Sequence, residues 1–354
     1  ALSAGVPVLG DVEIFGQMAR APVVGITGSN GKSTVTTLLG LMARQAGLRV
    51  AVGGNLGDPV LEILSDDVEL YVVELSSFQL ETTQSLPLRA ATVLNLSPDH
   101  MDRYPDMAAY AAAKRRIFAH AESAVVNRDD AAANGLADGV GHCIGFTLGA
   151  RVQSGDYGLA DHRGARWIVR GAIADPEPLM PMSELLLPGT HNLANVLAAL
   201  ALGELCGLEP AAMCGVLRTF RGLAHRSELV ADRNGVRWIN DSKGTNPGAT
   251  AAALEGLVPD PRLGKAVLIA GGDCKGADFT NLASTVSKTT RALVLIGRDA
   301  PRLAQALGSG IEVLHAVDMD EAVRFAAKAA LPGDCVLLSP ACASFDMFDD
   351  YQHR

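Results

Sequence analysis

The stretch Gly25-Ile26-Thr27-Gly28-Ser29-Asn30-Gly31-Lys32-Ser33 decides the fold class of this chain. It completes the apolar run Val23–Thr27, which we predict to be a buried strand, and leads into Ser33–Gln45, whose apolar residues recur with a helical period. Glycines at such a junction let backbone N–H groups turn toward an anion at the helix N-terminus, where the helix dipole favours negative charge. The stretch therefore predicts a phosphate-binding loop at the edge of an α/β sheet.

Apolar, strand-like runs alternate with helical patterns along most of the chain. In the first part the predicted strands are Val23–Thr27, Arg49–Val52, Leu70–Leu75 and Ala91–Leu96, and a long helix is predicted from His191 to Cys206. Short runs within 146–185 predict a small antiparallel excursion. In the second part the predicted strands are Val236–Asn240, Ala266–Ala270, Ala292–Ile296, Glu312–Ala316 and Cys335–Ser339. The helices between them are predicted near 248–257, 279–288, 300–308 and 319–330.

This alternation predicts two α/β domains, as the length of 354 residues also favours. Residues 21–220 are predicted to form a central ATP-binding domain with a P-loop NTPase-like parallel sheet and the antiparallel excursion. Residues 221–354 are predicted to form a Rossmann-like α/β domain. The chain begins at Ala1 without an initiator methionine, and we expect it to be a fragment of a longer protein.

Composition narrows the class of protein. The net charge of −9 argues against a nucleic-acid-binding scaffold, which would carry a basic surface. The six cysteines are scattered without metal-ligand spacing, which predicts reduced thiols in a cytoplasmic protein. No apolar run is long enough to span a membrane, and no signal peptide opens the chain. We expect a cytoplasmic, monomeric enzyme that acts on small molecules.

Lys32 and Ser33 are the chemical groups of the predicted phosphate loop. Lys32 would reach the β- and γ-phosphates of a nucleotide, and the Ser33 hydroxyl would bind Mg²⁺. The strict pattern wants glycine where Ile26 stands, with Gly25 one residue early. A plain glycine-rich turn is the alternative, and the strand before the loop and the helix after it favour phosphate binding.

Three further ionisable residues, at or near the ends of predicted strands or on a predicted helix, are candidates for the same site. Glu74 ends a predicted strand, where a carboxylate could hold Mg²⁺ or simply cap the next helix. His100 lies in the polar segment Asn95–Arg103, where a surface or a catalytic role is open. Lys114 lies on the small, apolar helix predicted over Ala111–Phe118, where a solvated lysine is the ordinary interpretation.

Further polar groups are predicted at strand and helix ends. Asn192 and Asn195 share one helical face and could contact a nucleotide or cap their helix. Asn240–Pro247 and Gly271–Gly276 are lysine-bearing loops that each follow a predicted strand. Together they favour a site for an anionic substrate, the alternative being turns with surface lysines.

Eight segments in this order resemble the Mur ligase family across essentially the whole chain. They are GITGSNGKST, VVELSSFQLE, NLSPDHMDR, HNLAN, HRSE, NDSKGTNPGAT, GGDCKGADF and LSPACASFD. The last segments are most similar to the branch that adds D-glutamate to UDP-N-acetylmuramoyl-L-alanine. The resemblance implies ATP-dependent amide synthesis through an acyl phosphate, in which glutamate's amine displaces phosphate.

The resemblance also implies roles for individual residues. Implied catalytic residues are Lys32, Glu74, His100 and Lys114. Implied ATP-binding residues are Gly28, Ser29, Asn30, Gly31, Lys32, Ser33, Thr34, Asn192, Asn195, Arg226 and Asp241. Two Mg²⁺ sites are implied, with ligands Ser33, Glu74, His100 and a carbamylated Lys114. Implied substrate contacts are Asn55, His100, Lys243, Thr245, Lys275, Ser344, Phe345 and Tyr351.

Two departures from the family pattern bear on substrate binding. Tyr351 stands where phenylalanine is the expected aromatic residue. The resemblance also implies that residues 1–20 are a linker from an N-terminal domain that holds the UDP group, that this chain lacks that domain, and that its C-terminal end is clipped. We therefore predict that this chain binds the UDP-sugar poorly. Calorimetric titration with UDP-N-acetylmuramoyl-L-alanine would test that expectation.

Two alternative functions stay open at this point. One is another ligase of the same superfamily, either L-glutamate-adding or folylpolyglutamate synthase-like, which the choice of amino acid would distinguish. The other is a non-catalytic nucleotide-binding module, which the joint presence of Lys32, Glu74, His100 and Lys114 disfavours.

Overall fold

The computed structural model describes residues 9–149, 152–172, 175–187 and 189–354, which divide into two compact units. Within these ranges the N-terminal unit comprises residues 9–97, 106–187 and 192–221, and the C-terminal unit comprises residues 98–105, 189–191 and 222–354. Residues 1–8 of the linker predicted over residues 1–20 lie outside the described residues. Helix α1 (Asp11–Met18) occupies most of the rest of it.

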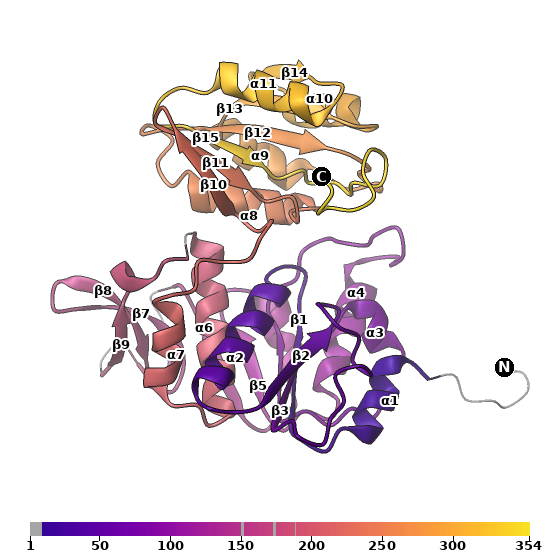
Figure 1. Cartoon of the computed structure of the whole chain (residues 1–354), viewed down its shortest axis with the longest axis vertical. Coiled ribbons are helices and arrows are strands. Elements are labelled where there is room, and N and C mark those ends of the chain that lie inside the picture. The colour runs from indigo at the N-terminus through magenta and orange to yellow at the C-terminus, as the bar shows by residue number, and fades with distance from the viewer. Residues whose placement is uncertain (1–8, 150–151, 173–174, 188) are drawn as a thin grey trace, which may run out of the picture. The chain divides into compact units, whose positions relative to one another are not determined.

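The N-terminal unit is built on one mostly parallel sheet (Figure 1). Its strands lie in the order β2 (Val50–Gly54), β3 (Leu70–Glu74), β1 (Val23–Thr27), β4 (Ala90–Val93), β5 (Ala124–Asn127), β6 (Cys143–Phe146), β7 (Tyr157–His162), β8 (Ala165–Arg170) and β9 (Glu177–Pro181). Strands β8 and β9 each run antiparallel to their preceding neighbour. The predicted antiparallel excursion is confirmed, and it extends the parallel sheet rather than forming a separate one.

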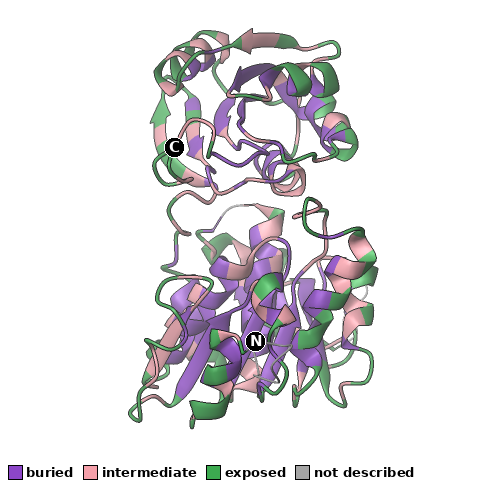
Figure 2. Cartoon of the chain, turned by 90° about the vertical axis from the view of Figure 1, so that its right-hand side faces the viewer, coloured by how far each residue is buried: buried purple, intermediate pink, exposed green. Residues whose placement is uncertain are grey.

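The central strands β1, β3 and β4 are buried along their length because helices cover this part of the sheet. Figure 2 shows purple, buried strands inside this unit. One face packs against α1, α3 (Ser77–Glu81) and the 3-10 turn Arg116–Phe118 that follows α4 (Met107–Arg115). Helix α2 (Lys32–Gln45) packs on β1, β2 and β3 and contacts α7 (Pro210–Leu217). The remaining helices are α5 (Ala131–Asn134) and α6 (Thr190–Leu205).

The C-terminal unit has a sheet of its own. Its strands lie in the order β10 (Glu228–Arg233), β11 (Val236–Asn240), β15 (Cys335–Leu338), β12 (Ala266–Gly271), β13 (Thr290–Ile296) and β14 (Glu312–His315). All neighbours are parallel except β10, which pairs antiparallel with β11. This confirms the prediction of a second, Rossmann-like α/β sheet.

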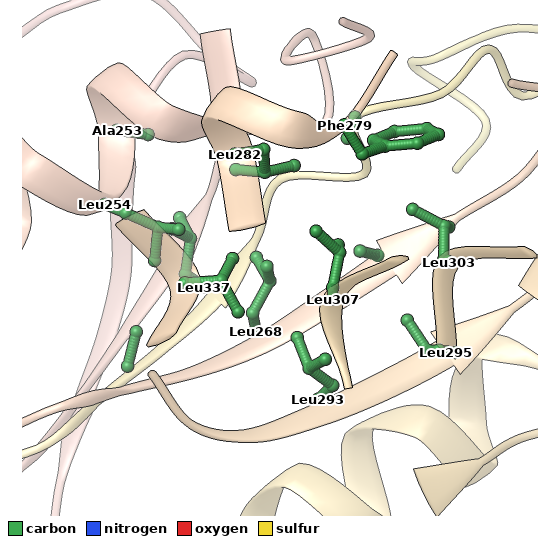
Figure 3. Close-up of a cluster of buried hydrophobic side chains, with 14 of the residues drawn as sticks. Ala253, Leu254, Leu268, Phe279, Leu282, Leu293, Leu295, Leu303, Leu307 and Leu337 are labelled. Carbon is green, nitrogen blue, oxygen red and sulfur yellow. The ribbon is translucent and has the colours of Figure 1, made fainter. Parts of the chain in front are cut away.

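The core of the C-terminal unit lies between this sheet and three helices. Leucines of β12, β13 and β15 interdigitate with side chains of α8 (Pro247–Leu257), α9 (Thr280–Thr289) and α10 (Ala300–Leu307) (Figure 3). Helix α11 (Met319–Ala329) packs against a second cluster that includes Val267 and Val294. Both clusters fix the strands, and therefore the loops at their carboxyl ends. Within the described ranges no helix is long and apolar enough to cross a membrane.

Candidate functional site

The phosphate loop has backbone geometry that only glycine fits. Gly28 and Gly31 have φ angles of 149° and 86°. A Cβ on Gly31 would lie 2.2 Å from Oδ1 of Asn195, and one on Gly28 would lie 3.2 Å from the backbone nitrogen of Leu94. Both glycines therefore combine a left-handed backbone with close packing, which leaves the loop compact at the N-terminus of α2.

Side chains beyond β4 hold this loop in place. Asn30 donates its backbone N–H to Oδ1 of Asn95 at 2.8 Å, and Asn95 Nδ2 donates back to the Asn30 carbonyl at 3.0 Å. The Ser29 hydroxyl donates to the Ser97 carbonyl and accepts from its N–H, both at 2.9 Å. Asn95 was not among the predicted site residues. Its only signal in the sequence is its place at the end of the predicted strand Ala91–Leu96, and the structure then shows that this strand lies beside β1.

Lys32 is the first residue of α2, and its ammonium lies over the loop. Nζ donates to the carbonyl of Gly28 at 2.8 Å and to that of Ser29 at 3.0 Å. Ser33 and Thr34 follow it and are buried. The loop therefore combines a helix N-terminus with a lysine charge at one place, which is the electrostatic requirement for binding phosphate.

Helix α6 brings the two predicted asparagines to the same loop. Asn192 and Asn195 are both buried, and Asn195 Nδ2 donates to Asn192 Oδ1 at 3.4 Å. Asn195 also packs against Gly31. These side chains therefore join the phosphate loop, and they lie inside helix α6 rather than capping it.

Glu74 ends β3 beside the loop, and one of its two oxygens lacks a partner. Asn55 Nδ2 donates to Oε1 at 2.7 Å. Oε2 is buried and has no hydrogen-bond partner among the residues that the structure describes. Because an unpaired carboxylate oxygen is costly to bury, this arrangement is typical of a site that takes up a cation. The helix-capping alternative is wrong, because Ser76 caps α3.

Lys114 is only 1% exposed, so the ordinary interpretation of a solvated lysine is wrong. Its Nζ donates to the Gly28 carbonyl at 2.9 Å and lies 3.3 Å from Oγ1 of Thr27. The same ammonium lies 4.7 Å from the ring centre of Tyr110. The structure therefore places Lys114 directly behind the phosphate loop.

His100 belongs to the C-terminal unit, whereas Lys114 belongs to the N-terminal unit. His100 has a φ of 57°, and its Nε2 lies 3.8 Å from Oδ2 of Asp99. That same oxygen accepts a hydrogen bond of 3.2 Å from Nδ2 of Asn246. The histidine segment is thereby tied to the start of α8.

Asp241 is a buried carboxylate at the carboxyl end of β11. Oδ2 accepts from the Ser339 hydroxyl at 2.6 Å, and Oδ1 accepts from the Ser227 N–H at 3.0 Å. Burial raises the pKa of Asp241 to about 6, although these hydrogen bonds and the positive charge of Arg226 oppose the rise. Arg226 and Asp241, both predicted ATP contacts, therefore interact. Ser339 was not predicted.

The C-terminal segment packs on the loop after β11. The ammonium of Lys243 lies 3.9 Å from the ring centre of Tyr351, and Ser242 Oγ donates to the Tyr351 carbonyl at 2.7 Å. Arg354 donates to Oγ and to the carbonyl of Ser242, at 3.1 and 2.8 Å. Burial lowers the pKa of Arg354 to about 10. Thr245 follows in the same loop and donates its backbone N–H to the Lys243 carbonyl at 2.8 Å.

The loops after β12 and β15 bring the other predicted substrate residues together. Lys275 lies 5.7 Å from the ring centre of Phe345, which is 69% exposed, whereas Ser344 is buried. Asp273 and Ala343 exchange two backbone hydrogen bonds of 2.9 Å, which pairs the two loops. A cation, a buried hydroxyl and an exposed ring therefore share one edge of the C-terminal sheet.

Comparison with known proteins covers both units. Residues 26–203 match the Mur ligase middle domain, and residues 225–342 match the Mur ligase, glutamate ligase domain. The UDP-N-acetylmuramoylalanine–D-glutamate ligase of Nitrosococcus oceani is 55% identical over 99% of this chain and 76% of its own length. The enzyme of the same name from Pseudomonas aeruginosa is 52% identical over the whole chain and 78% of its own length.

Solved structures show the same fold at much lower identity. MurF from Acinetobacter baumannii superposes with a TM-score of 0.72 at 19% identity, over 93% of this chain and 75% of that one. The MurF ligase of Thermotoga maritima in complex with ADP gives a TM-score of 0.70 at 19% identity, over 93% and 78% of the two chains. The chain therefore belongs to the Mur ligase family, and it is an ATP-dependent ligase of peptidoglycan synthesis.

Proposed function

We propose that this chain joins D-glutamate to UDP-N-acetylmuramoyl-L-alanine, using ATP, as a monomer in the cytoplasm. The names of relatives that are more than half identical support this choice of substrates. We further propose that residues 21–220 are the ATP-binding domain and residues 221–354 the glutamate-binding domain, after a linker at 1–20. The match of residues 225–342 to a glutamate ligase domain supports that assignment.

The nucleotide half of the proposal rests on the phosphate loop. Gly28 to Thr34 would surround the phosphates, with Lys32 neutralising their charge. The family resemblance also assigns nucleotide contacts to Asn192 and Asn195 of α6, and to Arg226 and Asp241. The close contact of Asn195 with Gly31 supports the part assigned to α6.

The buried carboxylate of Glu74 supports a Mg²⁺ site most directly. Oε2 is buried without a partner among the described residues, and carboxylate and hydroxyl oxygens are the ligands that Mg²⁺ prefers. Glu74 and Ser33 therefore fit the metal and would hold it. When bound, Mg²⁺ offsets the negative charge of the phosphates. Asn55 fixes Glu74 through its 2.7 Å hydrogen bond and would also contact the muramoyl substrate.

We assign a second Mg²⁺ to His100 and a carbamylated Lys114. A lysine ammonium repels a cation, whereas its carbamate carries a negative charge and two oxygens. The burial of Lys114 behind the phosphate loop supports this role, because its contacts with Thr27 and Gly28 hold the side chain beside the proposed nucleotide site.

The amino acid half rests on the loops of the C-terminal unit. Lys275, Ser344 and Phe345 would bind glutamate from β12 and β15, and Lys243, Thr245 and Tyr351 from β11 and the C-terminal segment. Two lysines would pair with the carboxylates of glutamate. The pairing of the β12 and β15 loops through Asp273 and Ala343 supports one composite site.

The proposed chemistry has two steps. The alanine carboxylate attacks the γ-phosphate, which releases ADP and leaves an acyl phosphate. The glutamate amine then attacks that carbonyl carbon, the C–O bond to phosphate breaks, and an amide and inorganic phosphate result. Lys32 stabilises the charge that moves between the phosphates, so the residues act by positioning and electrostatics rather than by covalent catalysis.

Phosphate release with one amino acid at a time tests the proposal. The chain is mixed with ATP, Mg²⁺ and UDP-N-acetylmuramoyl-L-alanine, and then with D-glutamate, L-glutamate or no amino acid. The sugar nucleotide is raised until the rate no longer increases, because we expect this chain to bind it weakly. We expect phosphate release only with D-glutamate, together with a product whose mass equals that of both substrates less one water. A preference for L-glutamate would contradict the substrate assignment.

A Lys32→Met variant is the control for contaminating ATPases. Its helix keeps an unbranched residue at the same position but loses the charge over the loop. We expect no glutamate-dependent phosphate release from it. Release that is equal in both proteins, or independent of the sugar nucleotide, would contradict the ligase proposal.

A further inference from the structure

Two buried cysteines face each other between the loops after β12 and β15. Cys274 and Cys342 are 3% and 1% exposed, and their Sγ atoms are 2.7 Å apart. That separation is within about 0.7 Å of a disulfide bond, which is about 2.05 Å long. Among the described residues, none of the other four cysteines has its sulfur within hydrogen-bonding distance of another cysteine's sulfur.

One backbone bridge beside the two thiols pairs the loops that carry them. Asp273 and Ala343 exchange both backbone hydrogen bonds in an antiparallel bridge. This bridge is isolated, and Cys274 and Cys342 are the residues next to it on the two segments, so the segments that carry the sulfurs are held side by side. Because the two Sγ atoms are already 2.7 Å apart, a bond of about 2.05 Å needs only a small movement.

Independent contacts hold each cysteine in place. Cys274 donates its N–H to Oδ2 of Asp299 at 2.8 Å, and the Cys342 carbonyl accepts from Nη1 of Arg354 at 3.2 Å. The two sulfurs are thus positioned by separate parts of the C-terminal unit.

We propose that Cys274 and Cys342 are a redox-active pair that closes to a reversible disulfide when a peroxide is the oxidant. A thiolate of the pair attacks the peroxide oxygen, which gives a sulfenic acid and releases the first water from hydrogen peroxide. The second sulfur displaces the sulfenic oxygen, which leaves as a second water when it takes up the remaining proton. Two thiols lose two hydrogens in all, and a dithiol reductant returns them by exchange.

The microenvironment makes the first of these steps slow and the second fast. Hydrogen bonding to Cys274 and burial raise the pKa of the Cys342 thiol, Asp299 raises it further, and Arg354 opposes them. Since the thiolate is the nucleophile, attack on peroxide is slow at neutral pH. Once a sulfenic acid forms, the partner sulfur is already in contact, so the disulfide forms before further oxidation.

The bond would cross-link the two loops that carry Lys275 and Ser344. If these residues bind glutamate, a point that rests on the proposed function, the redox state of the pair sets how rigidly that site is held. Disulfide formation itself does not depend on that function. It also restricts the unfolded chain between residues 274 and 342, so the oxidised C-terminal unit should unfold at a higher temperature.

Thiol counting on the folded, full chain tests the pair. After hydrogen peroxide treatment, the protein is denatured, alkylated and mapped by mass spectrometry. We expect alkylation of all six cysteines in the reduced protein. In the oxidised protein we expect two fewer, with Cys274 and Cys342 in one linked peptide pair that a dithiol separates. Six alkylated thiols, links to other cysteines, or sulfinic acid on either residue would overturn the proposal.

Matched serine variants separate the bond from a general effect of oxidation. Cys335→Ser changes a buried cysteine of the same unit and should keep both the linked peptides and the rise in unfolding temperature. Cys274→Ser should abolish both. A rise that persists in Cys274→Ser would overturn the proposed link. If that variant does not fold, the peptide map of the unaltered chain still decides the question.

Discussion

Oδ1 of Asn195 lies against the Cα atom of Gly31, so that a Cβ at residue 31 would come within 2.2 Å of it. This contact joins helix α6 to the phosphate loop across most of the N-terminal unit's sequence. It also gives Gly31 two separate reasons to lack a side chain, namely its positive φ and the nearness of Asn195.

We expect Gly31→Ala to weaken ATP binding by at least about tenfold, because the loop must shift to avoid Asn195. The left-handed backbone adds strain of about 1–2 kcal/mol. Calorimetric titration with MgATP and thermal unfolding measure the two effects. Gly47→Ala is the matched control, since Gly47 has a φ of 90° but no atom within 4 Å of the point that a Cβ would occupy. Equal loss of ATP affinity in both variants would contradict the role of the Asn195 contact.

We expect Glu74→Gln to raise stability while it lowers activity. The glutamine keeps an acceptor for Asn55 and removes a buried charge whose Oε2 has no partner among the described residues, so the metal-free protein should unfold at a higher temperature. The Mg²⁺ concentration for half-maximal phosphate release should rise more than about tenfold. Glu62→Gln, at an exposed position of the same unit, should change neither quantity. A destabilised Glu74→Gln protein would mean that the carboxylate is already balanced.

The sequence predicts the strands of the two sheets better than it predicts the contacts that side chains at the strand ends and in the loops make. Strands β1 and β11 have the predicted bounds, because β1 is almost entirely apolar or β-branched and β11 has three apolar residues among its five. Strands β5 and β6 have only four residues each, and β10 is largely exposed, so none of them shows a clear periodic pattern. Pairing with neighbouring strands, rather than local pattern, establishes these three.

Contacts within the candidate site follow from strand order, which the sequence does not contain. Asn55 reaches Glu74 because β2 lies beside β3, and Cys274 reaches Cys342 because β15 lies beside β12. The burial of Lys114 was equally hidden, since a helix of small residues looks the same whether it faces solvent or the back of a loop. Residue types at strand ends could be predicted, but their partners could not.

Asp241 makes the stability of the C-terminal unit dependent on pH. Burial raises its pKa from the ordinary 3.8 to about 6 in the folded chain, so below pH 4 both states are protonated and no penalty arises. As the pH rises through 6, the folded state must release a proton that the unfolded chain has already lost. We therefore expect Asp241→Asn to gain stability relative to the unaltered chain, by up to about 3 kcal/mol above pH 7.

Urea unfolding from pH 4 to pH 8 measures this difference. The chain has two tryptophans, so Trp238 of β11 alone reports on the C-terminal unit in a Trp167→Phe background. Asp232→Asn, at an exposed position of β10, is the control. A difference that stays constant across this range would show that Asp241 is not the titrating group.

Two substitutions of Tyr351 test whether its contact with the Lys243 ammonium depends on the aromatic ring or on the phenolic hydroxyl. The ammonium lies 3.9 Å from the ring centre, and a cation interacts with the face of an aromatic ring, which phenylalanine also provides. We expect Tyr351→Phe to leave the KM for D-glutamate within about twofold, whereas Tyr351→Leu should raise it by about fivefold or more, equivalent to about 1 kcal/mol. Steady-state phosphate release at saturating ATP measures both KM values.

Because the Ser242 hydroxyl donates to the backbone carbonyl of Tyr351, neither variant removes the hydrogen bond that holds the C-terminal segment on the loop after β11. Equal KM values for the leucine and phenylalanine variants would mean that Lys243 is positioned by other contacts.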